Sequence, residues 1–373
     1  MPRTFFETKM FKRYFVKLQR LLQTAIFCHR LTPIFSTNYP AVFLRAIRLC
    51  HRQGFSPEEA FLLGLFNMDF SGSELAKYIS RKRLTKVQEA VNPVSWAPLL
   101  KNKGIFYRHC TALGIPVPRL YAIFLRETAG WSYNDSALRD RNDWTRFFET
   151  QLPEEFVIKP VYGCGGKGLN IFRKTEAGFV DAFGRAYKSE QLYEIMSSDI
   201  GYDSFIIQQR LISHPELVYL SGTCALQTVR FITFVDSNSQ CHILLTYLKP
   251  IINEGVITDN FQLGRSGNVE ARVSLEDGTL SSALQITGDG SGVATIHIHP
   301  RTGIPFNGFK LPLWYQTCQL VKETAPRFLP VRAIGWDVAI TKDGASIVEG
   351  NIWWDPCNEH LCMDKVVETI AQI

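Results

Sequence analysis

The sequence contains no apolar run that approaches the roughly 18 residues of a membrane-spanning helix. Its nine cysteines form no C-x-x-C pair and no cysteine–histidine cluster at zinc spacing, which argues against a structural zinc site and a disulfide framework. The N-terminus also lacks the apolar core of a signal peptide, because five cations interrupt every apolar run: Lys9, Lys12, Arg13, Lys17 and Arg20. These absences predict a cytoplasmic protein.

Acidic residues are nearly absent from the N-terminal part. Residues 1–54 hold ten lysine and arginine residues and one acid, Glu7, so with an overall charge of +6 the rest of the chain is net negative. Apolar residues recur every three or four positions over residues 1–30, which predicts an amphipathic helix with a basic face. This helix either packs on its own domain or lies on an anionic surface at the inner membrane face; a transit peptide is a third interpretation. The segment carries no zinc, RNP or helix-turn-helix signature, so no nucleic-acid partner is expected.

Two proline-containing breaks mark a boundary in the chain. Asn92-Pro93 and Ala97-Pro98 end the helical pattern of the first part. Beyond them, short β-rich runs alternate with glycine-rich turns and a few helices. The sequence therefore predicts a mostly helical, basic region over residues 1–98 and an α+β domain over residues 99–373.

A glycine-rich stretch between Phe156 and Phe172 has the spacing G-x-G-x-x-G of a dinucleotide-binding turn. That turn requires a helix after its last glycine, whereas a β-like run, Leu-Asn-Ile-Phe, follows Gly168. A strand, a glycine-rich loop and a second strand in succession predict a hairpin. The free backbone N–H groups of such a loop can contact a polyphosphate. Lys159 ends the first strand, where a buried ammonium requires an anion such as an ATP phosphate. The pattern favours an ATP site over a dehydrogenase, with an ordinary glycine-rich hairpin as the alternative.

A second hairpin, from Gly335 to Asn351, carries a candidate metal site. Asp337 lies on its first strand, and Glu349 and Asn351 end its return strand. Because Glu349 and Asn351 are two residues apart, their side chains leave the same face, and the hairpin brings Asp337 beside them. Two carboxylates and an amide oxygen form the all-oxygen donor set that Mg²⁺ prefers. The alternative is a plain hairpin with acids facing solvent.

Taken together, these features resemble the ATP-grasp superfamily. In that superfamily, one lysine precedes a helix that ends in a G-[IV]-P turn, as Lys103 precedes Gly114-Ile115-Pro116. A second lysine, a glycine loop, and an acid followed on the next strand by E-x-N complete the resemblance. It covers about residues 100–365 and implies an ATP-grasp fold, in which two α+β subdomains clamp ATP, with ATP and Mg²⁺ as cofactors.

Longer stretches look like one group within that superfamily, the sugar-transfer-associated ATP-grasp proteins, whose members are linked to polysaccharide biosynthesis. These stretches are IIQQRLISHPEL (206–217), TVRFITFV (228–235), TDNF (258–261), HPRTGIPFNGFKLPLW (299–314) and the second hairpin.

The resemblance also implies a role for individual residues. The residues expected to bind ATP are Lys103, Lys159, Gly165, Gly166, Gly168 and the adenine-reading linker Gln208, Gln209, Arg210 and Leu211. Asp337, Glu349 and Asn351 are the expected metal ligands. Many ligases of the superfamily have a cation two residues before the first metal acid, where this chain has Gly335. We therefore predict that Arg230 and Lys159 are the catalytic cations. Alternatively, Arg230 has a structural role and pairs with an acid inside the sheet.

The predicted activity is that of an ATP-dependent carboxylate–amine ligase that forms an amide through an acylphosphate. An amino acid and a sugar acid or amino sugar of a surface glycan are the expected substrates, and Lys249, Asp259 and Asn260 are candidates for contacting the second one. Two alternatives stay open: an ATP-dependent kinase that phosphorylates a hydroxyl, and a non-catalytic scaffold of glycan assembly. The intact set of lysines and acids argues against the scaffold.

Overall fold

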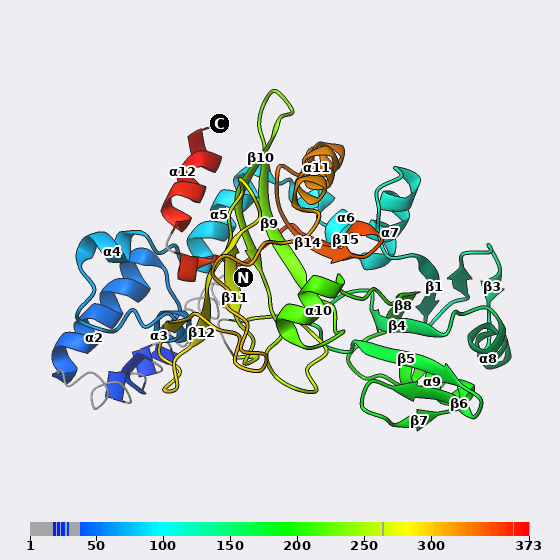
Figure 1. Cartoon of the computed structure of the whole chain (residues 1–373). Coiled ribbons are helices and arrows are strands. Elements are labelled where there is room, and N and C mark those ends of the chain that lie inside the picture. Colours follow the sequence, from blue (N-terminus) through cyan, green and yellow to red (C-terminus); the bar gives the residue numbers. More distant parts are fainter. Residues whose placement is uncertain are drawn as a thin grey trace, which may run out of the picture.

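Two antiparallel sheets carry most of the fold (Figure 1). The computed structural model describes residues 18–19, 21–22, 24–26, 28–29, 38–163, 165–262, 265–360 and 362–372. The first sheet has eight strands in the order β3-β2-β1-β8-β4-β5-β6-β7, and the second has seven in the order β13-β12-β11-β10-β9-β14-β15. In Figure 1 the first sheet lies at the right, the second in the middle and the N-terminal helices at the left. The predicted α+β class with a helical N-terminal region is confirmed.

The strands of the first sheet are β1 (Leu120–Leu125), β2 (Gly130–Ser132), β3 (Ala137–Leu138), β4 (Glu155–Pro160), β5 (Asn170–Thr175), β6 (Gly178–Asp181), β7 (Ala186–Tyr187) and β8 (Ser204–Gln209). Those of the second are β9 (Thr228–Val235), β10 (Cys241–Leu248), β11 (Glu270–Val273), β12 (Leu280–Ile286), β13 (Val293–Ile296), β14 (Ala333–Thr341) and β15 (Gly344–Asn351). The α-helices are α2 (Tyr39–Arg48), α3 (Pro57–Leu62), α4 (Gly72–Ala76), α5 (Arg81–Val91), α6 (Pro98–Lys101), α7 (Lys103–Ala112), α8 (Arg141–Thr150), α9 (Ser189–Ser197), α10 (Pro215–Ser221), α11 (Trp314–Thr324) and α12 (Met363–Gln372).

The N-terminal helices begin and end at recognisable signals. Ser56 caps α3 through a capping box with Glu59, and Gly54, at φ +81°, ends the π-helical turn that follows α2. The described residues between 18 and 29 are helical, while the rest of the amphipathic helix predicted over residues 1–30 lies outside the described part. Among the described helices, none combines the length and the apolar character that a bilayer crossing requires.

Strand β8, which lies between β1 and β4 in the first sheet, alternates its side chains between two cores. On β8, Phe205 and Ile207 face an aromatic core built with α8 and α9, which includes Trp144 and Phe148. Ile206, between them, joins the core on the other face, where α7 packs. This packing places the first turn of α7 beside the end of β4, where the two predicted ATP-binding lysines lie.

The second sheet packs against α11 on one face and against α5 and α12 on the other. The Asn92 side chain, just after α5, donates to the carbonyl oxygens of Ala333 at 2.8 Å and Ile352 at 3.2 Å. Its oxygen accepts from the N–H groups of Arg332 and Ala333, both at 2.9 Å. The helix α5 is therefore fastened to the strand that carries Asp337. The division of the chain at residue 98 remains a prediction.

Candidate active site

The glycine loop joins β4 and β5, which pair antiparallel, so the predicted hairpin is confirmed. Gly165, Gly166 and Gly168 have φ angles of +69°, +70° and +72°, a conformation that residues with a side chain rarely adopt. A Cβ on Gly166 would lie 2.5 Å from Thr258 Cγ2, and one on Gly165 would lie 2.8 Å from Gln262 Nε2. Glycine is thus required by both conformation and packing. Cys164, within the loop, lies outside the described residues.

The two predicted ATP-binding lysines converge at the base of this loop. Lys103 is the first residue of α7, and its ammonium donates to the carbonyl of Gly163 at 2.9 Å. Lys159, on β4, donates to the hydroxyl of Tyr107 at 3.2 Å. The side chain of Tyr107 lies four residues after Lys103 on the same face of α7, and its hydroxyl donates to Val348 on β15 at 2.6 Å. The lysines are only 8 % and 7 % exposed.

The surroundings of Lys159 disfavour its charged form. Burial, together with repulsion from Lys103, lowers the pKa of Lys159 to about 7, although Glu349 and Asp337 oppose the shift. Two buried ammonium groups at the base of a glycine loop suit a phosphate chain, which would offset both charges.

The second hairpin is present, and a register shift between Asp337 and Val338 sets how the ends of its strands pair. Asp337 on β14 lies opposite Glu349 on β15, and Gly335 lies opposite Asn351. The side chains of directly opposed residues point to the same face of a sheet, so the three predicted metal ligands lie on one face of the hairpin. The Asn351 amide nitrogen donates to the Gly335 carbonyl at 3.3 Å. A side chain at position 335 would collide with Trp354, since a Cβ there would lie 2.9 Å from it, which explains the missing cation.

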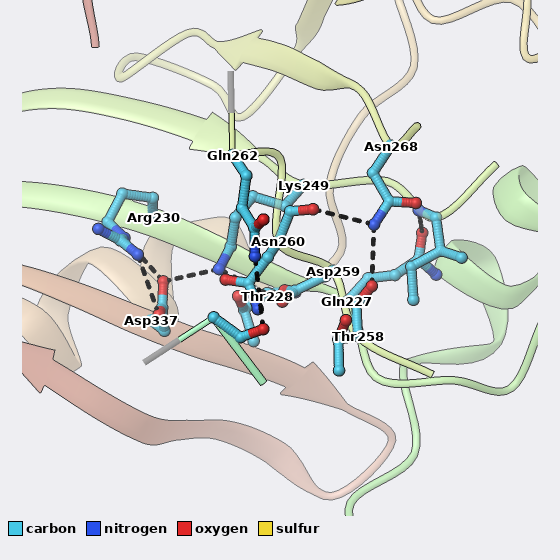
Figure 2. A network of polar contacts seen from close by, with 12 residues as sticks. Gln227, Thr228, Arg230, Lys249, Thr258, Asp259, Asn260, Gln262, Asn268 and Asp337 are labelled. Atoms are coloured by element: carbon cyan, nitrogen blue, oxygen red, sulfur yellow. Dashed lines mark hydrogen bonds and ion pairs between the residues drawn. The ribbon is translucent and has the colours of Figure 1, made fainter. Parts of the chain in front are cut away.

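Asp337 is held by two cations (Figure 2). Arg230, on the neighbouring strand β9, donates to it through Nε at 2.7 Å and Nη2 at 3.1 Å. The Lys249 ammonium lies 3.0 Å from Oδ1 of the same carboxylate. Burial raises the pKa of Asp337, but Arg230 and Lys249 outweigh burial and hold the pKa at about 2. Arg230 therefore does pair with an acid inside the sheet, as its alternative, structural role predicts. That acid is Asp337, which is itself a predicted metal ligand.

Of the three predicted second-substrate residues, Lys249 contacts Asp337 directly. Lys249 is 3 % exposed and also lies 3.4 Å from Asp259. Burial lowers the pKa of Lys249, but Asp259 and Asp337 reverse this effect and raise it. Asp259 in turn accepts from the backbone N–H of Thr228 at 2.7 Å and from its hydroxyl at 2.5 Å. Asn260 lies beside the glycine loop, with its Nδ2 3.3 Å from the position of a Cβ on Gly166.

The predicted adenine linker consists of the last two residues of β8 and the two residues that follow the strand. Gln208 is buried, and its Oε1 has no hydrogen-bond partner among the described residues, which leaves an acceptor for a donor such as the adenine amino group. The Gln209 side-chain oxygen accepts from the backbone N–H of Arg119 at 3.2 Å, and Arg210 pairs with Glu155 at 2.5 Å. The side chains of Gln209 and Arg210 thus bind the protein, and Leu211 is the second residue after the strand.

The donor set fits a metal that arrives with a nucleotide. Within the described ranges, no group of three or more histidine, cysteine, aspartate or glutamate side chains could hold a metal ion alone. Asp337, Glu349 and Asn351 offer two carboxylates and one amide oxygen, and Asp337 already binds two cations. Mg²⁺ usually takes only one or two carboxylates and completes its shell with water and substrate phosphates. The residues therefore fit Mg²⁺ as a complex with ATP.

Two residues that contact the site were not predicted. Tyr107 bridges Lys159 and β15, and Thr228 holds Asp259. Their spacing in the sequence places each on the same face as a predicted site residue. Tyr107 is four residues after Lys103 on a helix, and Thr228 is two residues before Arg230 on a strand.

One protein-family model matches most of this chain. The model of the sugar-transfer-associated ATP-grasp family matches residues 82–363. No curated protein matches the sequence. Solved structures similar to this chain include an ADP complex of N5-carboxyaminoimidazole ribonucleotide synthetase, with 12 % identity over 76 % of this chain and 53 % of that chain and a TM-score of 0.40. Another is D-alanyl-alanine synthetase A from Vibrio cholerae, with 12 % identity over 74 % of this chain and 65 % of that chain and a TM-score of 0.41.

A third is the biotin carboxylase domain of the 2-oxoglutarate carboxylase from Hydrogenobacter thermophilus, bound to MgADP, ADP and bicarbonate, with 12 % identity over 80 % of this chain and 52 % of that chain and a TM-score of 0.42. This chain thus spans between about half and two thirds of each structure. The family assignment rests on the family match, which covers most of the chain and both sheets. The predicted ATP-grasp fold, with its two α+β subdomains, is confirmed. The chain belongs to the sugar-transfer-associated ATP-grasp family.

Proposed function

We propose that this protein is an ATP-dependent carboxylate–amine ligase. The observation that carries the proposal is the convergence of two buried lysines, Lys103 and Lys159, with the acids Asp337 and Glu349 beside a glycine loop. The lysines require an anion, and the acids with Asn351 offer oxygen ligands to a divalent cation. Mg·ATP satisfies both requirements at once.

Each group has a defined task in this proposal. Lys103 and Lys159 offset the charge of the phosphates, and the amides of the glycine loop bind their oxygens. Asp337, Glu349 and Asn351 would hold Mg²⁺, which neutralises charge that develops on the β- and γ-phosphates. Arg230, fixed by Asp337, stabilises the transferring phosphoryl group in place of the cation that Gly335 lacks. The linker from Gln208 to Leu211 positions the adenine.

The reaction proceeds in two steps without a covalent enzyme intermediate. A substrate carboxylate attacks the γ-phosphorus of ATP, the bond to the bridging oxygen breaks, and an acylphosphate and ADP result. A neutral amine then attacks the acyl carbon, inorganic phosphate leaves, the amine loses a proton to solvent, and an amide remains. The carboxylate carries no proton, so the first step needs no general base. This suits a site in which both oxygens of Asp337 already bind cations.

The proposed substrates are an amino acid and a sugar acid or amino sugar, in polysaccharide biosynthesis, with Lys249, Asp259 and Asn260 near the second substrate. The experiment is turnover of Mg·ATP by the full chain with pools of these compounds, with ADP and inorganic phosphate measured separately. A ligase releases ADP and phosphate together, only when a carboxylate and an amine are both present. Release of ADP without phosphate, in the presence of a hydroxyl compound, would instead establish a kinase.

We also propose that the N-terminal helix contacts the inner face of a membrane. Leu18, Leu22 and Ile26 are spaced by four residues along the helix and are 56 %, 56 % and 54 % exposed. The cations of residues 1–30 complement an anionic lipid surface. A cytoplasmic enzyme held there would meet lipid-linked glycan intermediates.

A further inference from the structure

Residues 258–262 lie directly against the glycine loop. The Gln262 amide donates to the carbonyl of Gly165 at 3.5 Å, a long hydrogen bond. Thr258 closes the space over Gly166 so tightly that a single methyl group there would lie 2.5 Å from its Cγ2. The position of the glycine loop therefore depends on the position of this segment.

The same segment is fastened to the second sheet. The side chain of Asn268, which is fully buried, donates to the carbonyls of Thr258 at 2.8 Å and Asn260 at 3.2 Å. Asp259 accepts two hydrogen bonds from Thr228, the first residue of β9. Arg230 follows two residues later on β9, so the segment is anchored next to the residue that binds Asp337.

Lys249 connects this segment to the predicted metal site. Its ammonium lies between two carboxylates, 3.0 Å from Asp337 and 3.4 Å from Asp259. The side chain is 4 % exposed, so water screens its interactions with both carboxylates only weakly. A dication bound to Asp337 repels this ammonium at short range, and Asp259 is the partner that remains.

We propose that Asp259 is a positioning residue, which couples a divalent cation at Asp337 to the packing of residues 258–262 on the glycine loop. This inference rests on the proposed function, because it takes the cation to be the one bound with ATP. Binding of the cation transfers Lys249 from Asp337 to Asp259, and the stronger pair fixes residues 258–262 against Gly165 and Gly166. By thermodynamic reciprocity, a nucleotide that orders the glycine loop also raises the affinity for the cation.

The test measures amide hydrogen exchange in a peptide that contains Gly165, Gly166 and Gly168. The full chain is saturated with the ATP analogue AMP-PNP, either with Mg²⁺ or with EDTA. In the wild type we expect exchange to slow about tenfold more with Mg²⁺ than with EDTA. The Asp259→Asn variant, which removes the charge that receives Lys249, is expected to lose this difference while it still binds AMP-PNP in EDTA.

Two further variants keep the test specific. Gln262→Ala changes an exposed side chain that contacts the loop but none of the charges, and it is also expected to lose the Mg²⁺-dependent protection. Asp343→Asn makes the same chemical change at an exposed turn of the β14–β15 hairpin and is expected to behave as the wild type. A loss of protection in Asp343→Asn, or its retention in Asp259→Asn or in Gln262→Ala, would overturn the inference.

Failure of the inference is distinguishable from failure of the proposed function. If the wild type binds AMP-PNP but shows no Mg²⁺-dependent protection, the inference alone is overturned. If the wild type does not bind AMP-PNP with or without Mg²⁺, both are overturned.

Discussion

Arg230 and Asp337 lie directly opposite each other on the neighbouring strands β9 and β14, joined by two parallel hydrogen bonds of 2.7 and 3.1 Å. Their side chains are 14 % and 12 % exposed, so the pair is largely removed from water. The same carboxylate is a predicted ligand of the metal. A single acid thus links the cation proposed to stabilise phosphoryl transfer to the site proposed for Mg²⁺.

Arg230→Met is expected to reduce the free energy of unfolding by about 3 kcal/mol, because it removes one partner of a buried ion pair and leaves the other. Adding Asp337→Leu should restore part of that loss, since an apolar pair avoids an incompletely paired charge. Urea unfolding followed by tryptophan fluorescence measures both variants against Asp343→Asn. A loss below about 0.5 kcal/mol in Arg230→Met would show that the pair contributes little.

Lys159 predicts proton uptake when a nucleotide binds. Its pKa of about 7 in the free protein means that the ammonium is largely deprotonated at pH 8, whereas phosphate oxygens beside it favour the charged form. Binding of Mg·ADP at pH 8 should therefore take up most of a proton, and binding at pH 6 should take up almost none from this group. Calorimetry in two buffers of different ionisation enthalpy measures the uptake. Equal values at pH 8 for the wild type and Lys159→Met would contradict the assignment.

Gly166 and Gly184 form a matched pair for testing the glycine loop. Both have positive φ angles, +70° and +81°, but a Cβ on Gly184 meets nothing within 4 Å, whereas one on Gly166 meets Thr258. Alanine at either position should cost about 1 kcal/mol of stability from backbone strain. Only Gly166→Ala should also weaken Mg·ADP binding, by about tenfold, through the displaced loop. The same affinity loss in both variants would show that packing on Thr258 is irrelevant to nucleotide binding.

The exposed face of the N-terminal helix predicts membrane binding. Replacing Leu18, Leu22 and Ile26 by serine removes three exposed apolar side chains without changing any charge. We expect the affinity for vesicles with about 30 % anionic lipid to fall at least about tenfold, while nucleotide affinity stays unchanged. Unaltered sedimentation with vesicles would support the other interpretation, in which the helix packs on its own domain.

Local patterns in the sequence predicted the elements of the site. The β14–β15 hairpin follows from two apolar runs around an Asp-Gly turn, and the spacing of Glu349 and Asn351 places their side chains on one face. The helix α7 begins at Lys103 and is followed by Gly114, at φ +67°, as the resemblance implied. These features depend on residues close together in the chain, and such residues constrain one another directly.

The contacts between distant segments could not be predicted in this way. Arg230 and Asp337 are 107 residues apart, and their pairing depends on the register of β9 against β14, which no local pattern encodes. The packing of Thr258 and Gln262 on the glycine loop likewise depends on how the two sheets meet. The sequence therefore predicts Asp259 and Lys249 as substrate contacts, whereas the structure pairs Lys249 with both Asp259 and Asp337.

The most direct test of the central claim is Mg²⁺-dependent ATP turnover by Glu349→Gln. This variant keeps the shape of the side chain and removes the charge of one proposed metal ligand. With an active pair of carboxylate and amine substrates, we predict that the joint release of ADP and phosphate falls at least about a hundredfold, with the thermal unfolding midpoint unchanged. Turnover within a few-fold of the wild type would contradict the assignment of Mg·ATP chemistry to this hairpin.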